Sequence, residues 1–298
     1  MEIIPLSSHH IDDLTPLIND YIRLMPPKWQ LSTTQVAAIL QASSIWDIHY
    51  RDDEPDHPWR WETETMCVVE RDTALAAARY DQRYDDGIAA PSHIETRWLV
   101  GSAARPEALQ LLIDRLITFE KMGAVSVKVN SRCDFGWGWG GVPTATTFIN
   151  DLLQQNNFSI VQKWAVMTAD LSLLSPDTFG TITPFHLRWS LDDLHHEWTV
   201  EAYDDNTPVG ECQSWGIPLQ FAACPAYTEW MEIEWLGVED AYQRRGLGRG
   251  LLQEQMQFHR ERGVNYLALF VDAANAPALA LYESLGFQCE AECWGWGR

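Results

Sequence analysis

A glycine-containing loop between a strand pattern and a helix pattern constrains this chain more than any other feature. Residues 230–238, WMEIEWLGV, are aromatic and β-branched in period two, which predicts a strand. The loop 243–248, QRRGLG, follows, and an apolar helical pattern begins at Leu247. Such a loop aims several backbone N–H groups at one point, at the positive end of a helix dipole. The sequence therefore predicts a strand, a loop and a helix that bind a pyrophosphate.

Strict alternation along this strand predicts two faces. The first face carries Met231, Ile233 and Trp235, and the second carries Trp230, Glu232 and Glu234. The two glutamates would then share one face, where either can act as a base.

The loop on its own has a second interpretation, a plain turn from strand to helix. Two nucleotide-binding motifs are excluded. The dinucleotide fingerprint needs a third glycine at a fixed spacing, and the P-loop needs Gly-Lys-Ser/Thr; residues 243–250 have neither.

Two motifs in the last third of the chain resemble a known family. The loop fits Gln/Arg-x-x-Gly-x-Gly/Ala, and residues 275–287, NAPALALYESLGF, fit Asn-x6-Tyr-x3-Gly-Phe. Both are similar to motifs of the GCN5-related N-acetyltransferase (GNAT) superfamily, in the same order and spacing. The close resemblance covers about residues 230–287, and a weaker similarity of pattern extends it both ways.

The resemblance implies an α/β fold with a mixed sheet and acetyl-CoA as the acyl donor. It also implies a β-bulge near the end of the 230–238 strand, which separates that strand from its neighbour, residues 264–271, so that the cofactor can enter. Cofactor contacts are implied for Leu236, Gly237, Val238, Gln243, Arg244, Arg245, Gly246, Leu247, Gly248, Arg249, Asn275 and Tyr282.

The same resemblance suggests which residues carry out the chemistry. Glu232 stands where histone-type members carry a catalytic glutamate, and Glu234 is the alternative base; either can instead be a surface carboxylate. Tyr282 is implied as the acid that protonates the CoA sulfur, with a buried core tyrosine as the alternative. Asn275 can contact the pantetheine arm or cap a helix, or both. Glu211 and His196 are weaker candidates for the base.

The order of predicted elements indicates an internal repeat of one fold, which gives two tandem GNAT-like domains. We place a degenerate copy at residues 1–173 and the acetyl-CoA-binding copy at 174–298, with a linker within 172–180. The first copy has Val100–Ala108 instead of the glycine loop, with Glu107 in the first helical turn. Its counterpart of the tyrosine motif, Leu153-x3-Asn157-Phe158, lacks the tyrosine. The sequence therefore predicts one CoA site per chain.

Charge and cysteine usage limit the partners. The formal net charge of −21 disfavours nucleic acid and anionic membrane surfaces, and it permits cationic substrates. No Cys-x2-Cys pair or zinc spacing is present, so we expect no metal, and free thiols indicate a reducing compartment. The first residues, MEIIPLSSHH, have no signal-peptide pattern, and cytoplasmic localisation is expected. A homodimer is left open. The six cysteines are Cys67, Cys133, Cys212, Cys224, Cys289 and Cys293.

Together these observations predict an N-acetyltransferase that acts on a primary amine of a small, cationic acceptor. The alternatives are a CoA-binding sensor or scaffold without turnover, and a protein N-acetyltransferase. The sequence identifies neither the acceptor nor the length of the acyl group.

Overall fold

The chain folds into two compact units. The computed structural model of the protein describes residues 1–41, 59–85, 88, 90–124, 126–129, 141–174, 184–192, 196–217, 224 and 227–298. Unit 1 consists of Met1–Trp164 with Ala291–Arg298, and unit 2 consists of Ala165–Glu290. Among these described residues, no helix is long and apolar enough to cross a membrane.

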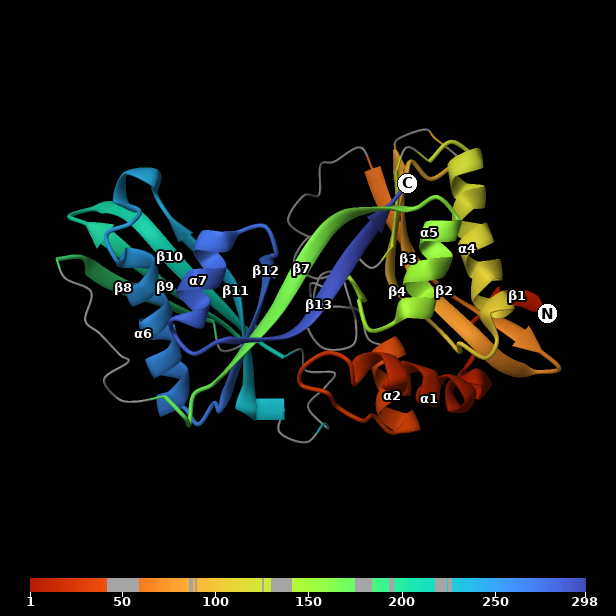
Figure 1. Ribbon diagram of the computed structural model, residues 1–298, viewed down its shortest axis with the longest axis horizontal. Helices are drawn as coiled ribbons and strands as arrows, with labels where there is room; N and C mark the ends of the chain where they lie inside the picture. The colour runs from red at the N-terminus through yellow and green to blue at the C-terminus, as the bar shows by residue number, and fades with distance from the viewer. Residues whose placement is uncertain are drawn as a thin grey trace. The chain divides into compact units, whose positions relative to one another are not determined.

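Unit 1 is a sheet with helices on its faces (Figure 1). Its strand order is β1-β2-β3-β4-β5-β13. Among the described residues, β4 and β5 pair in parallel and the other neighbouring strands pair antiparallel. Residues of α4 and α5 enclose one core with β2 to β5, while α1 contacts β3 and β4. The elements are β1 (Glu2–Pro5), η1 (Ser8–His10), α1 (Ile11–Ile22), α2 (Thr33–Gln41), β2 (Trp59–Glu70), β3 (Thr73–Asp85), β4 (His93–Gly101), α4 (Pro106–Lys121), β5 (Ser126–Val129), β6 (Val142–Pro143) and α5 (Thr147–Gln155).

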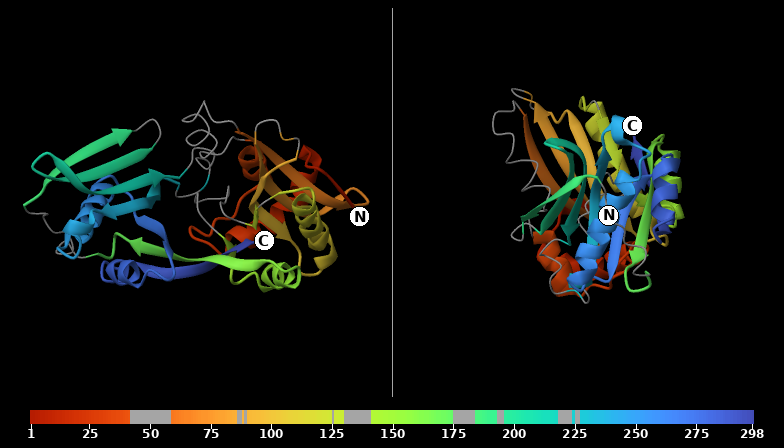
Figure 2. Two further views of the ribbon diagram at one scale, coloured as in Figure 1. Left: turned by 90° about the horizontal axis from the view of Figure 1, so that it is seen from above. Right: turned by 90° about the vertical axis from the view of Figure 1, so that its left-hand side faces the viewer.

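Unit 2 repeats this plan with the strand order β7-β12-β11-β10-β9-β8. The pairs β8–β9, β9–β10 and β10–β11 are antiparallel, whereas β11 and β12 pair in parallel. Helices α6 and α7 share one core with the sheet, and Figure 2 shows them on the same side of it. The elements are β7 (Ser159–Asp170), β8 (His186–Asp192), β9 (Glu197–Asp204), β10 (Thr207–Gly216), η4 (Tyr227–Glu229), β11 (Trp230–Val238), η5 (Asp240–Tyr242), α6 (Leu247–Glu261), β12 (Tyr266–Asp272), α7 (Ala276–Glu283) and β13 (Gln288–Gly297).

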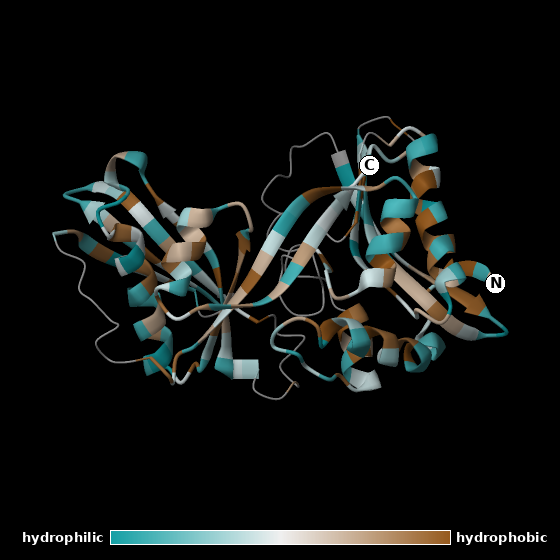
Figure 3. Ribbon diagram, in the orientation of Figure 1, coloured by the Kyte–Doolittle hydropathy of each residue, from teal (hydrophilic) through white to brown (hydrophobic). Residues whose placement is uncertain are grey.

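Local sequence explains where the long helices begin and end. Helix α4 starts with Pro106, whose missing N–H costs nothing there, and stops before Gly123, whose φ is +112°. Helix α6 ends in the same way at Gly263, with φ +83°. In Figure 3, hydrophobic and hydrophilic residues alternate around α4, and its buried residues include Leu109, Leu112 and Leu116.

The final strand completes unit 1 rather than unit 2. Residues 291–298 belong to unit 1, where Trp296 pairs with Val129 of β5 and Trp294 pairs with Val142 of β6. In return, residues 165–170 of β7 belong to unit 2. The predicted division into residues 1–173 and 174–298 follows the chain without this exchange of strands. The exchange comes from long-range pairing, which local patterns do not reveal.

The long helices and strands follow the order that the sequence predicts. The strands β1, β6 and β8 and the 3-10 helices were not predicted, and the strand β13 was expected only as a tail from Gln288. The sequence predicts the first long strand from Thr65, whereas β2 begins at Trp59. The polar, proline-containing stretch 44–58 and the stretch 133–141, CDFGWGWGG, are predicted from the sequence as loops. The first lies outside the described residues, as do residues 133–140 of the second and residues 175–180 of the predicted linker.

Candidate active site

Strand β11 leaves its neighbour β12 halfway along. The two strands pair in parallel from Trp230 opposite Tyr266 to Ile233 opposite Leu269, and β11 then continues to Val238. On its other side, β11 pairs with β10 along its length, but the register shifts so that Glu234 is an extra residue between Ile233 and Trp235. The predicted bulge and the separation of the strands are therefore present. The bulge lies at Glu234, earlier than the 236–238 segment where it was expected.

The bulge reverses the faces of the second half of β11. Before it, Met231 and Ile233 contact the core; after it, Leu236 and Val238 do so. The predicted grouping of Trp235 with Met231 and Ile233 is wrong, because one extra residue shifts the period-two alternation. The Trp235 side chain is 55% exposed, and its Nε1 would lie 2.7 Å from a Cβ placed on Gly237. A side chain at position 237 would therefore displace this indole.

The loop after β11 leads directly into the N-terminus of α6. Gly246 precedes the helix with φ +85°, and no atom lies within 4 Å of a Cβ placed there. The first turn of α6 contains no acidic residue, and no side chain of the loop caps it. The first N–H groups of a helix lack carbonyl partners within the helix, so this end can bind an anion. A Cβ placed on Gly248 would lie 3.5 Å from Val238 and 4.0 Å from Leu281, so α6 begins beside the end of β11 and α7.

Polar side chains brace this loop. Gln243 donates to the Val238 carbonyl oxygen at 3.0 Å and to Asp240 at 2.9 Å. Arg249 donates to the Ser284 hydroxyl at 2.6 Å, and Arg245 lies over the Tyr242 ring at 5.3 Å. Gln243 and Arg249 thus have structural partners, and their predicted cofactor contacts stay predictions.

The two candidate carboxylates differ in environment. Glu232 lies opposite Trp215 of β10 and Ala268 of β12, and it is only 4% exposed. Glu234 is the extra residue of the bulge and is half-buried, so simple alternation does not set its face. The prediction that the two share a face therefore does not follow from the observed strand. A buried carboxylate beside a strand opening is suited to accept a proton.

Tyr282 lies at the C-terminal end of α7 in the core of unit 2. It is 9% exposed, and its ring lies 5.8 Å from that of Phe287. Burial, with a smaller contribution from Cys212, raises the pKa of Tyr282 to about 12. The phenol therefore stays protonated at neutral pH and can donate.

Asn275 caps α7. Its side-chain oxygen accepts a hydrogen bond from the Ala278 N–H at 3.2 Å. The predicted capping role is confirmed, and the predicted contact with a pantetheine arm stays a prediction. Of the weaker base candidates, Glu211 is exposed and lies opposite Gly237, and His196 has φ +56°.

A buried polar network next to the bulge was not predicted. Ser214 lies 2.7 Å from Nε2 of His259 and donates to Gln255 at 3.0 Å, while Gln255 donates to the Cys212 and Trp198 carbonyl oxygens at 2.8 and 2.9 Å. Burial, with a smaller contribution from Arg262, lowers the pKa of His259 to about 3, so the imidazole is neutral. The network ties α6 to β10 where its register with β11 shifts. Its signal in the sequence is the i, i+4 pair of Gln255 and His259 on the apolar face of α6.

Unit 1 repeats the backbone features but not the chemistry. Its strand β4 also has one extra residue, Arg97, and its described pairing with β5 runs from His93 opposite Ser126 to Thr96 opposite Val129, the last described residue of β5. Arg97 forms a buried ion pair with Asp81 at 2.7 Å. The bulge residue of unit 1 is therefore a cation, whereas the corresponding bulge residue of unit 2, Glu234, is a carboxylate. The turns after the last helices also correspond, because Asn157 and Gly286 have φ +62° and +93°.

The helix after β4 begins differently from α6. Glu107 lies in the first turn of α4 as predicted, and a hydrogen bond from Arg105 lowers the pKa of this carboxyl. A charged carboxylate therefore already occupies the helix N-terminus, where a phosphate would be repelled.

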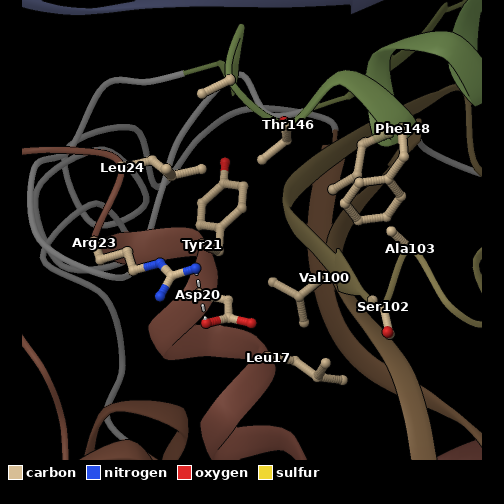
Figure 4. Close-up of a pocket in the computed structure, with 13 residues that line it drawn as sticks. Leu17, Asp20, Tyr21, Arg23, Leu24, Val100, Ser102, Ala103, Thr146 and Phe148 are labelled. Atoms are coloured by element: carbon tan, nitrogen blue, oxygen red, sulfur yellow. Dashed lines mark ion pairs between the residues drawn. The ribbon is translucent and has the colours of Figure 1, made fainter.

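A cavity of about 330 Å³ lies at the C-terminal end of β4 (Figure 4). Its wall comes from α1, from the end of β4 with the residues that follow, and from the start of α5. An ion pair of 3.3 Å joins Arg23 to Asp20 at its edge, and Tyr21 donates to the Gly141 carbonyl oxygen at 3.2 Å. Unit 1 thus keeps a cavity beside the strand end that corresponds to Val238, without the glycine loop.

Comparison with known proteins agrees with the division into units. The model of the acetyltransferase (GNAT) family matches residues 164–287, which nearly coincide with unit 2. Mycothiol acetyltransferase of Acidothermus cellulolyticus is 47% identical over 57 residues, 19% of this chain and 17% of that protein. The ribosomal protein bS18-alanine N-acetyltransferase of Escherichia coli K12 is 54% identical over 52 residues, 17% of this chain and 35% of that protein. The matches thus span about a sixth to a third of the length of these relatives.

The fold of the whole chain has a counterpart among solved structures. A tandem GNAT protein from the clavulanic acid biosynthesis pathway matches with a TM-score of 0.68 at 11% identity, over 100% of this chain and 98% of that one. At this identity the match shows the fold alone. Residues 164–287 therefore match the acetyltransferase (GNAT) family, and the whole chain has the fold of a tandem GNAT protein.

Proposed function

We propose that unit 2 transfers an acetyl group from acetyl-CoA to the primary amine of a small, cationic acceptor. The observation that carries this proposal is that the pairing of β11 with β12 stops after Ile233, which leaves an opening between the two strands. The same strand β11 then leads into the N-terminus of α6, which no side chain caps. A thioester arm needs such an opening along a strand, and a pyrophosphate needs such a helix end. The match to acetyltransferases over the same residues supports the assignment.

Residues already described can supply each part of the reaction. The amine nitrogen forms a bond to the thioester carbonyl carbon, and the carbon–sulfur bond breaks. We assign the thioester to the backbone of Leu236, Gly237 and Val238, and the pyrophosphate to the loop around Gly246. Glu232, or Glu234 as the alternative, takes one proton of the ammonium group. Tyr282 gives its proton to the leaving thiolate, and the second proton that the nitrogen loses as the amide forms restores the phenol.

The first test measures acetyl-CoA consumption with a panel of acceptors. Polyamines, amino sugars, arylamines, amino acids and an alanine-terminated peptide are compared at one concentration. Turnover with a small cationic amine is expected. The peptide is included because one relative acetylates a ribosomal protein at alanine. If only the peptide is acetylated, the chain is a protein N-acetyltransferase; if CoA binds without turnover on any acceptor, unit 2 is a sensor.

Glu232→Gln is expected to lower the rate most at low pH. The loss in kcat/KM should be about 100-fold near pH 6.5 and at most about tenfold near pH 9.5, because a free amine needs no base. The measurement is the pH–rate profile beside the wild type, with Glu201→Gln on β9 as a control. A loss that does not vary with pH contradicts a base role for Glu232. If Glu234→Gln alone gives a rate loss that is larger at low pH than at high pH, the base is Glu234.

Added salt is expected to weaken the reaction of a cationic acceptor. The chain has a net charge of −21, and residues 216–229 before β11 contain no Lys or Arg. Raising the salt concentration from about 0.05 to 0.5 M should lower kcat/KM for a diamine by about threefold or more, because screening shortens the reach of the carboxylates. The control is a monoamine whose remaining groups are uncharged, measured at saturating acetyl-CoA, so that effects of salt on acetyl-CoA binding are separated from effects on the acceptor. Equal salt dependence for both amines, or a best acceptor that is anionic, contradicts the electrostatic proposal.

A further inference from the structure

Three side chains that can ligate a metal meet in unit 1, and none of them is among the acyl-transfer residues assigned to unit 2. His9 and His10 lie in η1 at the entry to α1, and Asp72 lies in the two-residue turn between β2 and β3. One ligand atom of each residue lies within 4.8 Å of the other two. The exposed fractions of the side chains are 59% for His9, 0% for His10 and 85% for Asp72.

The distances match ligands of one ion better than hydrogen bonds. Oδ1 of Asp72 lies 3.5 Å from Nε2 of His9 and 3.9 Å from Nε2 of His10. Hydrogen bonds from nitrogen to oxygen are about 2.7–3.2 Å long, so both distances are too long. Ligands about 2.0–2.2 Å from one tetrahedral zinc ion lie roughly 3.3–3.6 Å apart. A small movement of the exposed Asp72 side chain therefore brings its carboxylate to this spacing from both Nε2 atoms.

Ser7 contacts the other ring nitrogen of both histidines. Its hydroxyl oxygen lies 2.8 Å from Nδ1 of His9 and 3.0 Å from Nδ1 of His10, and 3.5 Å from Nε2 of His9. A hydroxyl oxygen can accept from two N–H donors, so this contact is compatible with both rings as the Nδ1–H tautomer. In that tautomer both Nε2 atoms present lone pairs for a metal ion. Metal-binding histidines are commonly held in this way by a partner on the other ring nitrogen.

His10 supplies a second, independent observation. The ring is fully buried, and its Nε2 has no hydrogen-bond partner among the residues that the structure describes. A buried polar atom left without a partner costs free energy, so a native structure usually gives it one. On its other side, Nδ1 also lies 3.6 Å from the thiol of Cys67. The unsatisfied atom is the one that points to the carboxylate.

From this geometry we propose that unit 1 binds one divalent transition-metal ion of the zinc class. His9 and His10 ligate it through Nε2 and Asp72 through its carboxylate, and water completes the coordination on the exposed side. This set is close to the three protein ligands that hold zinc in open sites. The ion joins the β2–β3 turn to the start of α1, where Asp13 already accepts a hydrogen bond from the Ala74 N–H at 3.0 Å. Its role is to stabilise unit 1.

The test uses the full chain after treatment with a chelator. Zn²⁺ is titrated against a chromophoric zinc indicator, and Co²⁺ is added separately to read the coordination by its visible absorption. One ion per chain is expected, with a tetrahedral Co²⁺ spectrum and a rise in Tm. His9→Gln and Asp72→Asn, both at exposed positions, should each weaken Zn²⁺ binding by at least about tenfold.

A matched variant separates the site from general effects of charge. Asp205→Asn makes the same change in the β9–β10 turn of unit 2, where Asp205 also has a positive φ of +54°. It should leave Zn²⁺ affinity within about twofold of the wild type. Zn²⁺ binding that survives His9→Gln combined with Asp72→Asn overturns the proposal, as does binding lost only in Cys289→Ser. The absence of one-to-one binding at micromolar Zn²⁺ overturns it as well.

Discussion

Tyr282→Phe is expected to lower kcat by about 100-fold or more while the Kd for acetyl-CoA stays within about twofold. The phenylalanine ring can keep the contact with Phe287, and only the proton donor is lost. Since burial raises the pKa of Tyr282 to about 12, the phenol is protonated throughout the working range. The ratio of wild-type to variant rate should therefore stay flat from about pH 6 to 9, unlike the tilted profile expected for Glu232→Gln.

Tyr266→Phe is the matched control. Tyr266 is in the same unit but stacks on Trp230 at 4.6 Å, at the start of β11, where the strands are still paired. Its loss of a hydroxyl should change kcat by less than about twofold. If Tyr282→Phe also stays within twofold, Tyr282 is a structural core residue and the proton comes from another group.

Gly246→Glu should weaken acetyl-CoA binding by at least about 100-fold. The substitution places a carboxylate at the N-terminus of α6, where the proposal puts the pyrophosphate. Losing one or two charge-assisted hydrogen bonds, each worth about 1.5–3 kcal/mol, accounts for this change. Calorimetry on the full chain measures both the affinity and the number of CoA sites, and one site per chain is expected.

Gly263→Glu controls for the backbone strain of this substitution. Gly263 stands at the other end of α6 with φ +83°, almost the value of Gly246, and a Cβ there also meets no atom within 4 Å. Both variants then carry a similar strain, but only one brings charge to the loop. Unchanged CoA affinity in Gly246→Glu, or two CoA sites in the wild type, contradicts the assignment of the loop.

The local part of the site could be predicted from the sequence. The strand, loop and helix from Trp230 to Glu261 follow from short-range patterns, because residue types set the periods and Gly246 permits the positive φ at the helix start. The correspondence of Asn157 with Gly286 was visible for the same reason, since asparagine also tolerates the left-handed conformation.

The parts that depend on one extra residue or on distant pairing could not be predicted. Alternation assigns Trp235 to the core, and nothing in the residues near Glu234 shows that the register with β10 slips there. The partners of Gln255 and His259 are 41 or more positions away in sequence, so the network forms only once β10 and α6 have met. The cluster of His9, His10 and Asp72 joins residues of different elements in the same way.

The exchange of strands has a consequence for the order of events during synthesis. The part of β13 that pairs with β5, at Trp296 and Gly297, leaves the ribosome after all of unit 2. Unit 1 therefore cannot be completed before all of unit 2 has been synthesised, unlike the usual course in which the N-terminal domain folds first. Until β13 arrives, β5 presents an open strand edge, which is a site for wrong pairing. Unit 1 is thus the first half to be made and the last to be finished.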